Sequence, residues 1–174
     1  MIGSHEIHEK ARSLTQHFGT NDPVRLAKEM GIKVYDVPNL TELLGMYVCR
    51  WKSRIILMNP NINDALYRMV LAHEIGHDQL HRELAASGDL REFELFNMVD
   101  MTEYEANAYA AHILIDDDEM MELLRNGYDL AQAASSLRVN INLLLIKTQE
   151  MRRMGMDLRL PFDPDAKFFR NTRY

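Results

Sequence analysis

Val70-Leu71-Ala72-His73-Glu74-Ile75-Gly76-His77 is the stretch that decides the fold of this chain. Two histidines four residues apart lie on one face of an α-helix, about 6 Å apart at Cβ, and this spacing suits two imidazoles on one tetrahedral zinc ion. The glutamate beside the first histidine can reach a water on that ion and act as a general base. Apolar residues recur every three or four positions, which predicts a helix over residues 63–81. Taken alone, the motif also fits an amphipathic helix without a metal.

A zinc peptidase site needs a third protein ligand and an open fourth position. The metzincin pattern would place Gly and His three and six residues after His77, and those positions hold Leu80 and Glu83, so the sequence excludes it. His81 follows His77 by four residues, but a straight helix turns it away from a metal held by the first two histidines. His81 is therefore predicted to lie on the surface or beside a ligand.

The better candidate for the third ligand is Glu103. It begins a stripe of small and apolar residues at helical spacing, in which a charged carboxylate needs a partner because an unpaired buried charge is costly. A metal would supply that partner, and Asn107, one turn on, could hydrogen-bond a ligand histidine. Glu105 falls on the other side of this helix, with Tyr109, His112 and Asp116.

Helix capping is the alternative role for Glu103. Asp100 and Glu103 have the spacing of a capping box, and so do Thr102 and Glu105. The second box fits well and leaves Glu103 available to a metal.

Residues 73–77, followed by Glu103-Tyr104-Glu105-Ala106-Asn107-Ala108-Tyr109-Ala110, resemble the ImmA/IrrE family of zinc metallopeptidases, whose motifs are H-E-[IL]-G-H and E-x-E-A-N-x-F-A. Tyr109 replaces the usual Phe, and residues 114–117 lack the proline of the family's Leu-Leu-Met-Pro-like stretch. The resemblance extends over about residues 22–151. It implies a gluzincin-type site in which His73, His77 and Glu103 bind Zn²⁺ and Glu74 is catalytic. It also implies that the substrates are helix-turn-helix repressors that silence mobile elements or stress genes.

The composition of the chain limits the number of domains, the cellular compartment and the kinds of partner that we expect. The 174 residues fit one domain, and 47% hydrophobic residues are enough to bury a core. Cys49 is the only cysteine, so no intramolecular disulfide can form, and it is predicted to pack in a strand. No apolar run reaches the ~20 residues that span a bilayer and no signal segment is evident, so we expect a cytoplasmic protein without a membrane partner. The net charge of −6 argues against direct binding of nucleic acid.

The order of predicted elements gives an α+β fold class. Helices are expected over residues 5–18 and from Pro23, where Asp22 is the N-cap, and strands over 33–37, 45–50 and 54–58. Together they predict a mainly helical, zincin-like domain with a small antiparallel sheet before the active-site helix. His5-Glu6-Ile7-His8 has its histidines only three apart and is predicted to be a solvated helix start.

The hairpin over residues 45–58 is the candidate for substrate docking, because an edge strand beside such a site can hold a peptide extended through main-chain hydrogen bonds. The residues proposed for this role are Gly45, Tyr47, Ile55 and Leu57. An ordinary structural hairpin is the alternative.

Residues 1–128 are predicted to form the metallopeptidase domain, with a linking segment that contains a short helix from about Asp89 and a last helix that ends near Arg125. Residues 129–153 resemble a helix-turn-helix unit, but the second helix is strongly apolar, so we expect a packed helical pair. Residues 154–174 form a tail that could pack on the domain, dock a partner or cover the cleft as an inhibitor.

The sequence therefore predicts a zinc endopeptidase with a repressor as its protein substrate. The oxyanion needs a second donor, and four tyrosines are candidates: Tyr47, Tyr67, Tyr104 and Tyr109. Two alternatives remain open: a non-proteolytic anti-repressor with structural zinc, and a DNA-binding regulator with a vestigial site.

Overall fold

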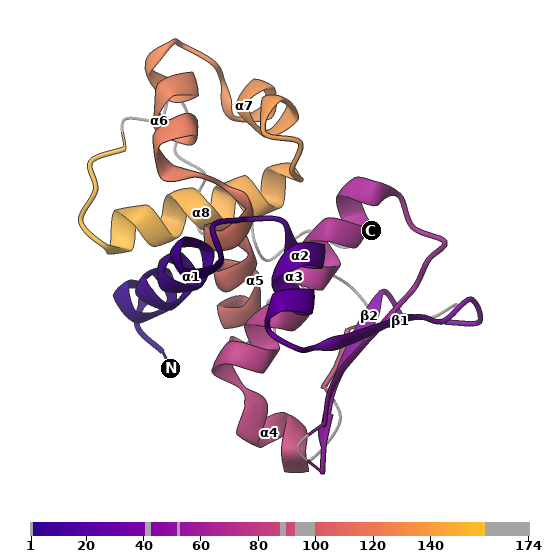
Figure 1. Cartoon of the computed structure of the whole chain (residues 1–174). Helices are drawn as coiled ribbons and strands as arrows, with labels where there is room; N and C mark the ends of the chain where they lie inside the picture. The colour runs from indigo at the N-terminus through magenta and orange to yellow at the C-terminus, as the bar shows by residue number, and fades with distance from the viewer. Residues whose placement is uncertain (1, 41–42, 52, 88–89, 93–99, 159–174) are drawn as a thin grey trace.

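The computed structural model describes residues 2–40, 43–51, 53–87, 90–92 and 100–158 (Figure 1). The fold is α+β and mainly helical, as predicted. Its helices and strands are, in chain order, α1 (Ser4–Phe18), α2 (Pro23–Glu29), β1 (Lys33–Asp36), β2 (Gly45–Arg50), β3 (Ser53–Met58), α3 (Asp64–Leu80), α4 (Arg82–Ser87), β4 (Leu90–Glu92), α5 (Met101–Leu114), α6 (Asp117–Arg125), α7 (Leu130–Ser136) and α8 (Ile141–Arg153).

The sheet has the order β1-β3-β2-β4 and is mixed. Strand β2 is antiparallel to β3, as expected, and it is also antiparallel to β4, a strand that was not predicted. Strand β1 is parallel to β3. The prediction of a wholly antiparallel sheet was wrong on this point, because the hairpin folds β3 back between β1 and β2. Strand β4 comes from the segment after α3, so the sheet is also not complete before the active-site helix.

Polar side chains cap α2 and α3, at the predicted N-cap Asp22 and at Asn63, near which the latter helix was expected to begin. Asp22 accepts a hydrogen bond from the amide of Val24, with Pro23 beginning α2. Asn63 accepts one from the amide of Leu66 and begins α3. These bonds satisfy amides that have no partner inside the helix.

Helices α3 and α5 lie side by side at the centre of the molecule, with the sheet beyond α3 and with α1 and α8 against α5 (Figure 1). Gly76 on α3 permits this close approach, because a Cβ there would lie 3.0 Å from the carbonyl oxygen of Ala106. Strand β2 packs on α3, and Cys49 is buried within β2 as predicted.

The segment after α3 differs from the prediction. A short helix was expected from about Asp89, whereas α4 covers Arg82–Ser87 and β4 covers Leu90–Glu92. The apolar residues of 93–98 and the tail from residue 159 lie outside the described residues. Among the described helices, none has the length and apolar character needed to cross a membrane.

Helix α8 packs against α5, and its apolar residues enter the same core as α3 and α5. Leu143, Leu144 and Ile146 are buried there. Side chains buried in this way cannot contact base edges. The division of the chain at residue 128 and the assignment of residues 129–153 as a packed helical pair stay predictions.

Candidate metal centre

Three potential metal ligands converge between α3 and α5: His73, His77 and Glu103. The Nε2 atoms of the two histidines are 2.9 Å apart. Carboxylate oxygens of Glu103 lie 3.2 Å from Nε2 of His73 and 3.4 Å from Nε2 of His77. The histidines are buried, and the Glu103 side chain is 20% exposed although its Oε2 atom is buried.

These distances suit one small metal ion. A tetrahedral ion with bonds of about 2.0–2.1 Å holds its ligand atoms roughly 3.3 Å apart, close to the three separations observed. Two imidazoles and one carboxylate are also a donor set typical of catalytic zinc. Burial lowers the pKa of His77 to about 4, which favours the neutral imidazole that binds a metal. The residues present therefore fit Zn²⁺.

The outward-facing nitrogens of both histidines have partners. Nδ1 of His73 lies 3.1 Å from Oδ1 of Asn107, the residue that the sequence nominated for this contact. Nδ1 of His77 lies 3.1 Å from Nδ1 of His81. His81 is 5% exposed, so of the two positions expected for it, the one beside a ligand is observed.

Glu74, the predicted general base, is fully buried on α3. Its side chain faces β2 at Gly45, where a Cβ atom would lie 2.7 Å from Oε1 of Glu74. The missing side chain of Gly45 therefore provides the space for the Glu74 carboxylate. Sequence reasoning had nominated Gly45 for substrate binding and not for this role.

Glu105 is the residue that sequence reasoning missed. It was placed away from the metal in a capping box with Thr102, but Asp100 caps α5 by accepting from the amide of Thr102. Glu105 is instead 4% exposed. Its Oε2 atom lies 2.9 Å from Nε2 of His81, and its Oε1 atom accepts a 2.7 Å hydrogen bond from the amide of Ile2.

The four tyrosines proposed as oxyanion donors are occupied or enclosed. Tyr47 donates to Asp78, Tyr67 to Asp36, and Tyr104 to Glu150. The hydroxyl of Tyr109 has no hydrogen-bond partner among the described residues, but the side chain is fully buried. The prediction of a tyrosine donor gains no support from these contacts.

The docking strand proposed from the sequence needs correction. Strand β3, which carries Ile55 and Leu57, lies between β1 and β2, so its main chain is paired on both sides. Strand β4 pairs with β2 from Gly45 to Tyr47, and the Tyr47 side chain is fully buried. These four residues do not form an open edge, because pairing over long sequence distances closes it.

A second cluster brings together His8, His112 and Asp117 from α1, α5 and α6. The Nδ1 atoms of the two histidines are 3.2 Å apart. The ammonium of the buried Lys147 lies 2.9 Å from Nδ1 of His112 and pairs with Asp117, so a cation already occupies this cluster. The sequence predicted a solvated helix start over residues 5–8. His5 and Glu6 are exposed as expected, but Ile7 is buried and His8 is partly buried, because α1 packs this face on α5.

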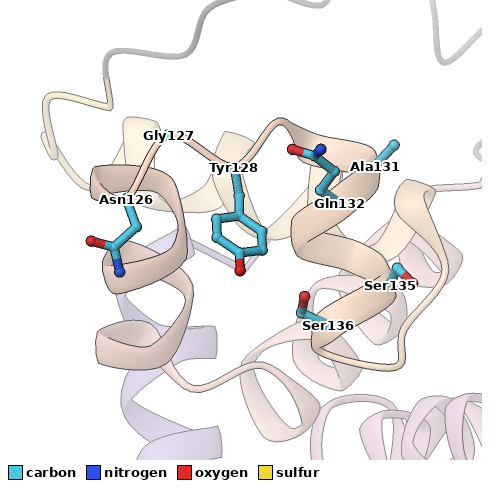
Figure 2. Close-up of a pocket in the computed structure, with 7 residues that line it drawn as sticks. All are labelled: Asn126, Gly127, Tyr128, Ala131, Gln132, Ser135 and Ser136. Atoms are coloured by element: carbon cyan, nitrogen blue, oxygen red, sulfur yellow. The ribbon is translucent and has the colours of Figure 1, made fainter.

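An open hollow lies between α6 and α7, where the ring of Tyr128 points between the two helices (Figure 2). None of its lining residues comes from α3 or α5, so it is separate from the metal centre. Those residues are Asn126, Gly127, Tyr128, Ala131, Gln132, Ser135 and Ser136.

Comparison with known proteins finds a family model and a relative that match this chain. The family model of the IrrE N-terminal-like domain, Peptidase_M78, matches residues 27–148, a range that includes all of α3 and α5. "Uncharacterized immunity region protein 2" of Bacillus phage phi105 is 33% identical over 111 residues, which cover 64% of this chain and 69% of the phage protein.

Proposed function

This chain belongs to the IrrE N-terminal-like family of peptidases, Peptidase_M78, and from that premise we propose that it is a zinc-dependent endopeptidase acting on a protein substrate. The observation that carries the proposal is the convergence of His73, His77 and Glu103, whose ligand atoms lie close enough together to hold one metal ion. Glu74 directly follows His73 and precedes His77 by three residues on the same helix, which supports its proposed role as the general base.

The proposed roles follow from the donor set. When bound, zinc supplies Lewis acidity, which polarises the scissile carbonyl and makes a water acidic enough to be deprotonated near neutral pH. His73 and His77 hold their outward nitrogens against Asn107 and His81 and so keep Nε2 aimed at the metal position. Glu74 takes a proton from the attacking water and delivers it to the amine that leaves.

We propose a helix-turn-helix repressor as the substrate, so that cleavage relieves repression. Support comes from the motif resemblance and from the phage relative, which is named for an immunity region. The protein would act through the repressor and not by binding DNA itself, since the apolar face of α8 is used in packing.

The decisive experiment combines metal content with cleavage. Wild type should contain about one zinc per chain, and Glu103→Ala should lose most of it. Glu74→Gln should keep zinc but abolish cleavage of the repressor encoded nearest to this gene, with fragments identified by mass spectrometry. Glu122→Gln, an exposed glutamate on α6, is the matched control and should cleave normally.

Two outcomes would refute parts of this proposal. Cleavage retained in Glu74→Gln would remove the assigned general base. Zinc binding without any cleavage, together with tight repressor binding, would favour the non-proteolytic anti-repressor.

A further inference from the structure

We propose that Glu105 and His81 are positioning residues for His77, and that the main chain at Ile2 fixes the far end of this contact chain, so that the N-terminal segment contributes to zinc affinity. The inference rests on the proposed zinc site. It adds to that site a line of contacts from a metal ligand to a segment far away in the sequence.

The contacts form an unbroken series. Nδ1 of His77 lies 3.1 Å from Nδ1 of His81, and Nε2 of His81 lies 2.9 Å from Oε2 of Glu105. The other oxygen of Glu105 accepts the 2.7 Å hydrogen bond from the amide of Ile2. His77, His81 and Glu105 are at most 5% exposed, so water does not easily replace these partners.

Metal binding allows one arrangement of protons along this series. If Nε2 of His77 binds zinc, its Nδ1 carries the ring proton and donates to Nδ1 of His81. Nδ1 of His81 then accepts, so its Nε2–H group donates to Oε2 of Glu105. The other carboxylate oxygen, Oε1, accepts from the amide of Ile2. Every donor has an acceptor, so the series orients the His77 ring for the metal.

The two ligand histidines are thus positioned by different parts of the chain. His73 is held by Asn107, which lies on the same helix as Glu103. His77 is held through His81 and Glu105, and Glu105 accepts from the amide of Ile2, which lies 103 residues before Glu105 in the sequence. The side chain of Ile2 packs against the core, which keeps that amide in place. Loosening the N-terminal segment would therefore affect one zinc ligand more than the other.

The test measures zinc affinity of the purified full chain by competition with a chromophoric chelator. His81→Phe keeps a buried ring but removes both hydrogen bonds, and Glu105→Ala removes both acceptors. Each should weaken zinc binding by roughly 10- to 100-fold. The double variant should bind zinc no more weakly than the single variant with the lower zinc affinity, because the effects of two residues in one series are not additive. Glu105→Gln retains one carbonyl acceptor and should lie between Glu105→Ala and wild type.

His112→Phe is the matched control, since it also removes a buried imidazole but one outside the series. It should melt at a lower temperature and keep wild-type zinc affinity. Ile2→Pro lacks the amide donor, whereas Ile2→Ala keeps it; with an N-terminal tag on both, only the proline variant should bind zinc several-fold more weakly.

Some results would overturn the inference. If His81→Phe and Glu105→Ala bind zinc as wild type does, while Glu103→Ala loses it, the series is structural and the proposed zinc site still stands. If His81→Phe and His112→Phe lose zinc affinity equally, the loss comes from lower stability of the fold and not from the contacts of His77. Absence of zinc from wild type, even when it is supplied, would overturn both the inference and the proposed function.

Discussion

Glu74 and Gly45 are in direct contact across the interface of α3 and β2: a Cβ atom on Gly45 would lie 2.7 Å from Oε1 of Glu74. It would also lie 2.7 Å from Cγ1 of Val70, one turn earlier on α3. Strand β2 pairs at this position with Met58 on one side and Glu92 on the other, so its main chain has little freedom to retreat. Glycine is required here because the carboxylate fills the space of a side chain.

Gly45→Ala should therefore impair catalysis more than metal binding. The added methyl group must displace Glu74, and misplacement by about 1 Å can reduce a rate on the order of 100-fold. Zinc content should stay near wild type, because the methyl group meets none of the three metal ligands. Repressor cleavage and zinc content measured on the same preparation check this, and normal cleavage would show that the site tolerates the shift.

Gly76→Ala should weaken both the fold and zinc binding. Its Cβ would meet the carbonyl oxygen of Ala106 at 3.0 Å and Cβ of Tyr109 at 3.2 Å, so α5 must move away from α3. Overpacking of this kind costs about 1–3 kcal/mol, and it separates Glu103 from the two histidines. Urea denaturation and chelator competition measure the two effects. Gly3→Ala, where an added Cβ meets nothing within 4 Å, is the control, and zinc affinity equal in both variants would contradict the prediction.

Local patterns made much of the fold predictable. Spacing of four residues placed His73 and His77 on one face, and the apolar stripe that begins at Glu103 identified the side of α5 that faces α3. Asp22, as an N-cap before Pro23, identified where α2 begins. Each of these inferences depends on residues within a few positions of one another, where the periodicity of a helix limits the possible arrangements.

The features that sequence analysis missed depend on distant partners. Parallel pairing of β1 with β3, and the pairing of β4 with β2, follow from the path of the chain and not from local periodicity. Glu105 could be assigned to a capping box because its spacing from Thr102 permits one. Its actual partners, His81 and the amide of Ile2, lie on other elements. The burial of Glu105, which makes a partner for its charge necessary, is seen only in the structure.

Asp78→Asn should destabilise the protein by about 3 kcal/mol, because it removes one side of a buried charge pair. Asp78 is buried and accepts from Nε of Arg54 at 2.7 Å, from Nη2 of Arg54 at 2.6 Å and from the hydroxyl of Tyr47 at 2.7 Å. Burial alone would raise the pKa of Asp78, but these hydrogen bonds lower it below the usual value. The network attaches α3 to β2 and β3, next to His77.

Arg82→Ala provides the control for this network. Arg82 also donates to Asp78, at 3.0 Å, but its side chain is 49% exposed. A partly exposed pair contributes less than about 1 kcal/mol. Urea denaturation of Asp78→Asn and Arg82→Ala measures both free energies of unfolding. Equal decreases in the two variants would show that burial does not govern the strength of these contacts.

The stability of the protein should fall as pH decreases, with His112 as one identifiable source. Burial, and then the charges of Lys147 and His8, lower the pKa of His112 from 6.5 to about 2. Between these values the unfolded chain binds a proton that the folded chain excludes, so the free energy of unfolding decreases with falling pH. One such proton contributes at most about 1.4 kcal/mol per pH unit.

His112→Phe tests this assignment, because phenylalanine takes up no proton in either state. The variant is expected to be less stable than wild type near neutral pH, where the contacts of His112 with Lys147 and His8 are lost. From pH 7 to pH 5, however, its free energy of unfolding should fall less steeply than that of wild type, by up to about 1.4 kcal/mol per pH unit. Urea denaturation of both proteins at several pH values gives the two slopes. Parallel slopes would show that other groups, such as His8, take up the proton on unfolding.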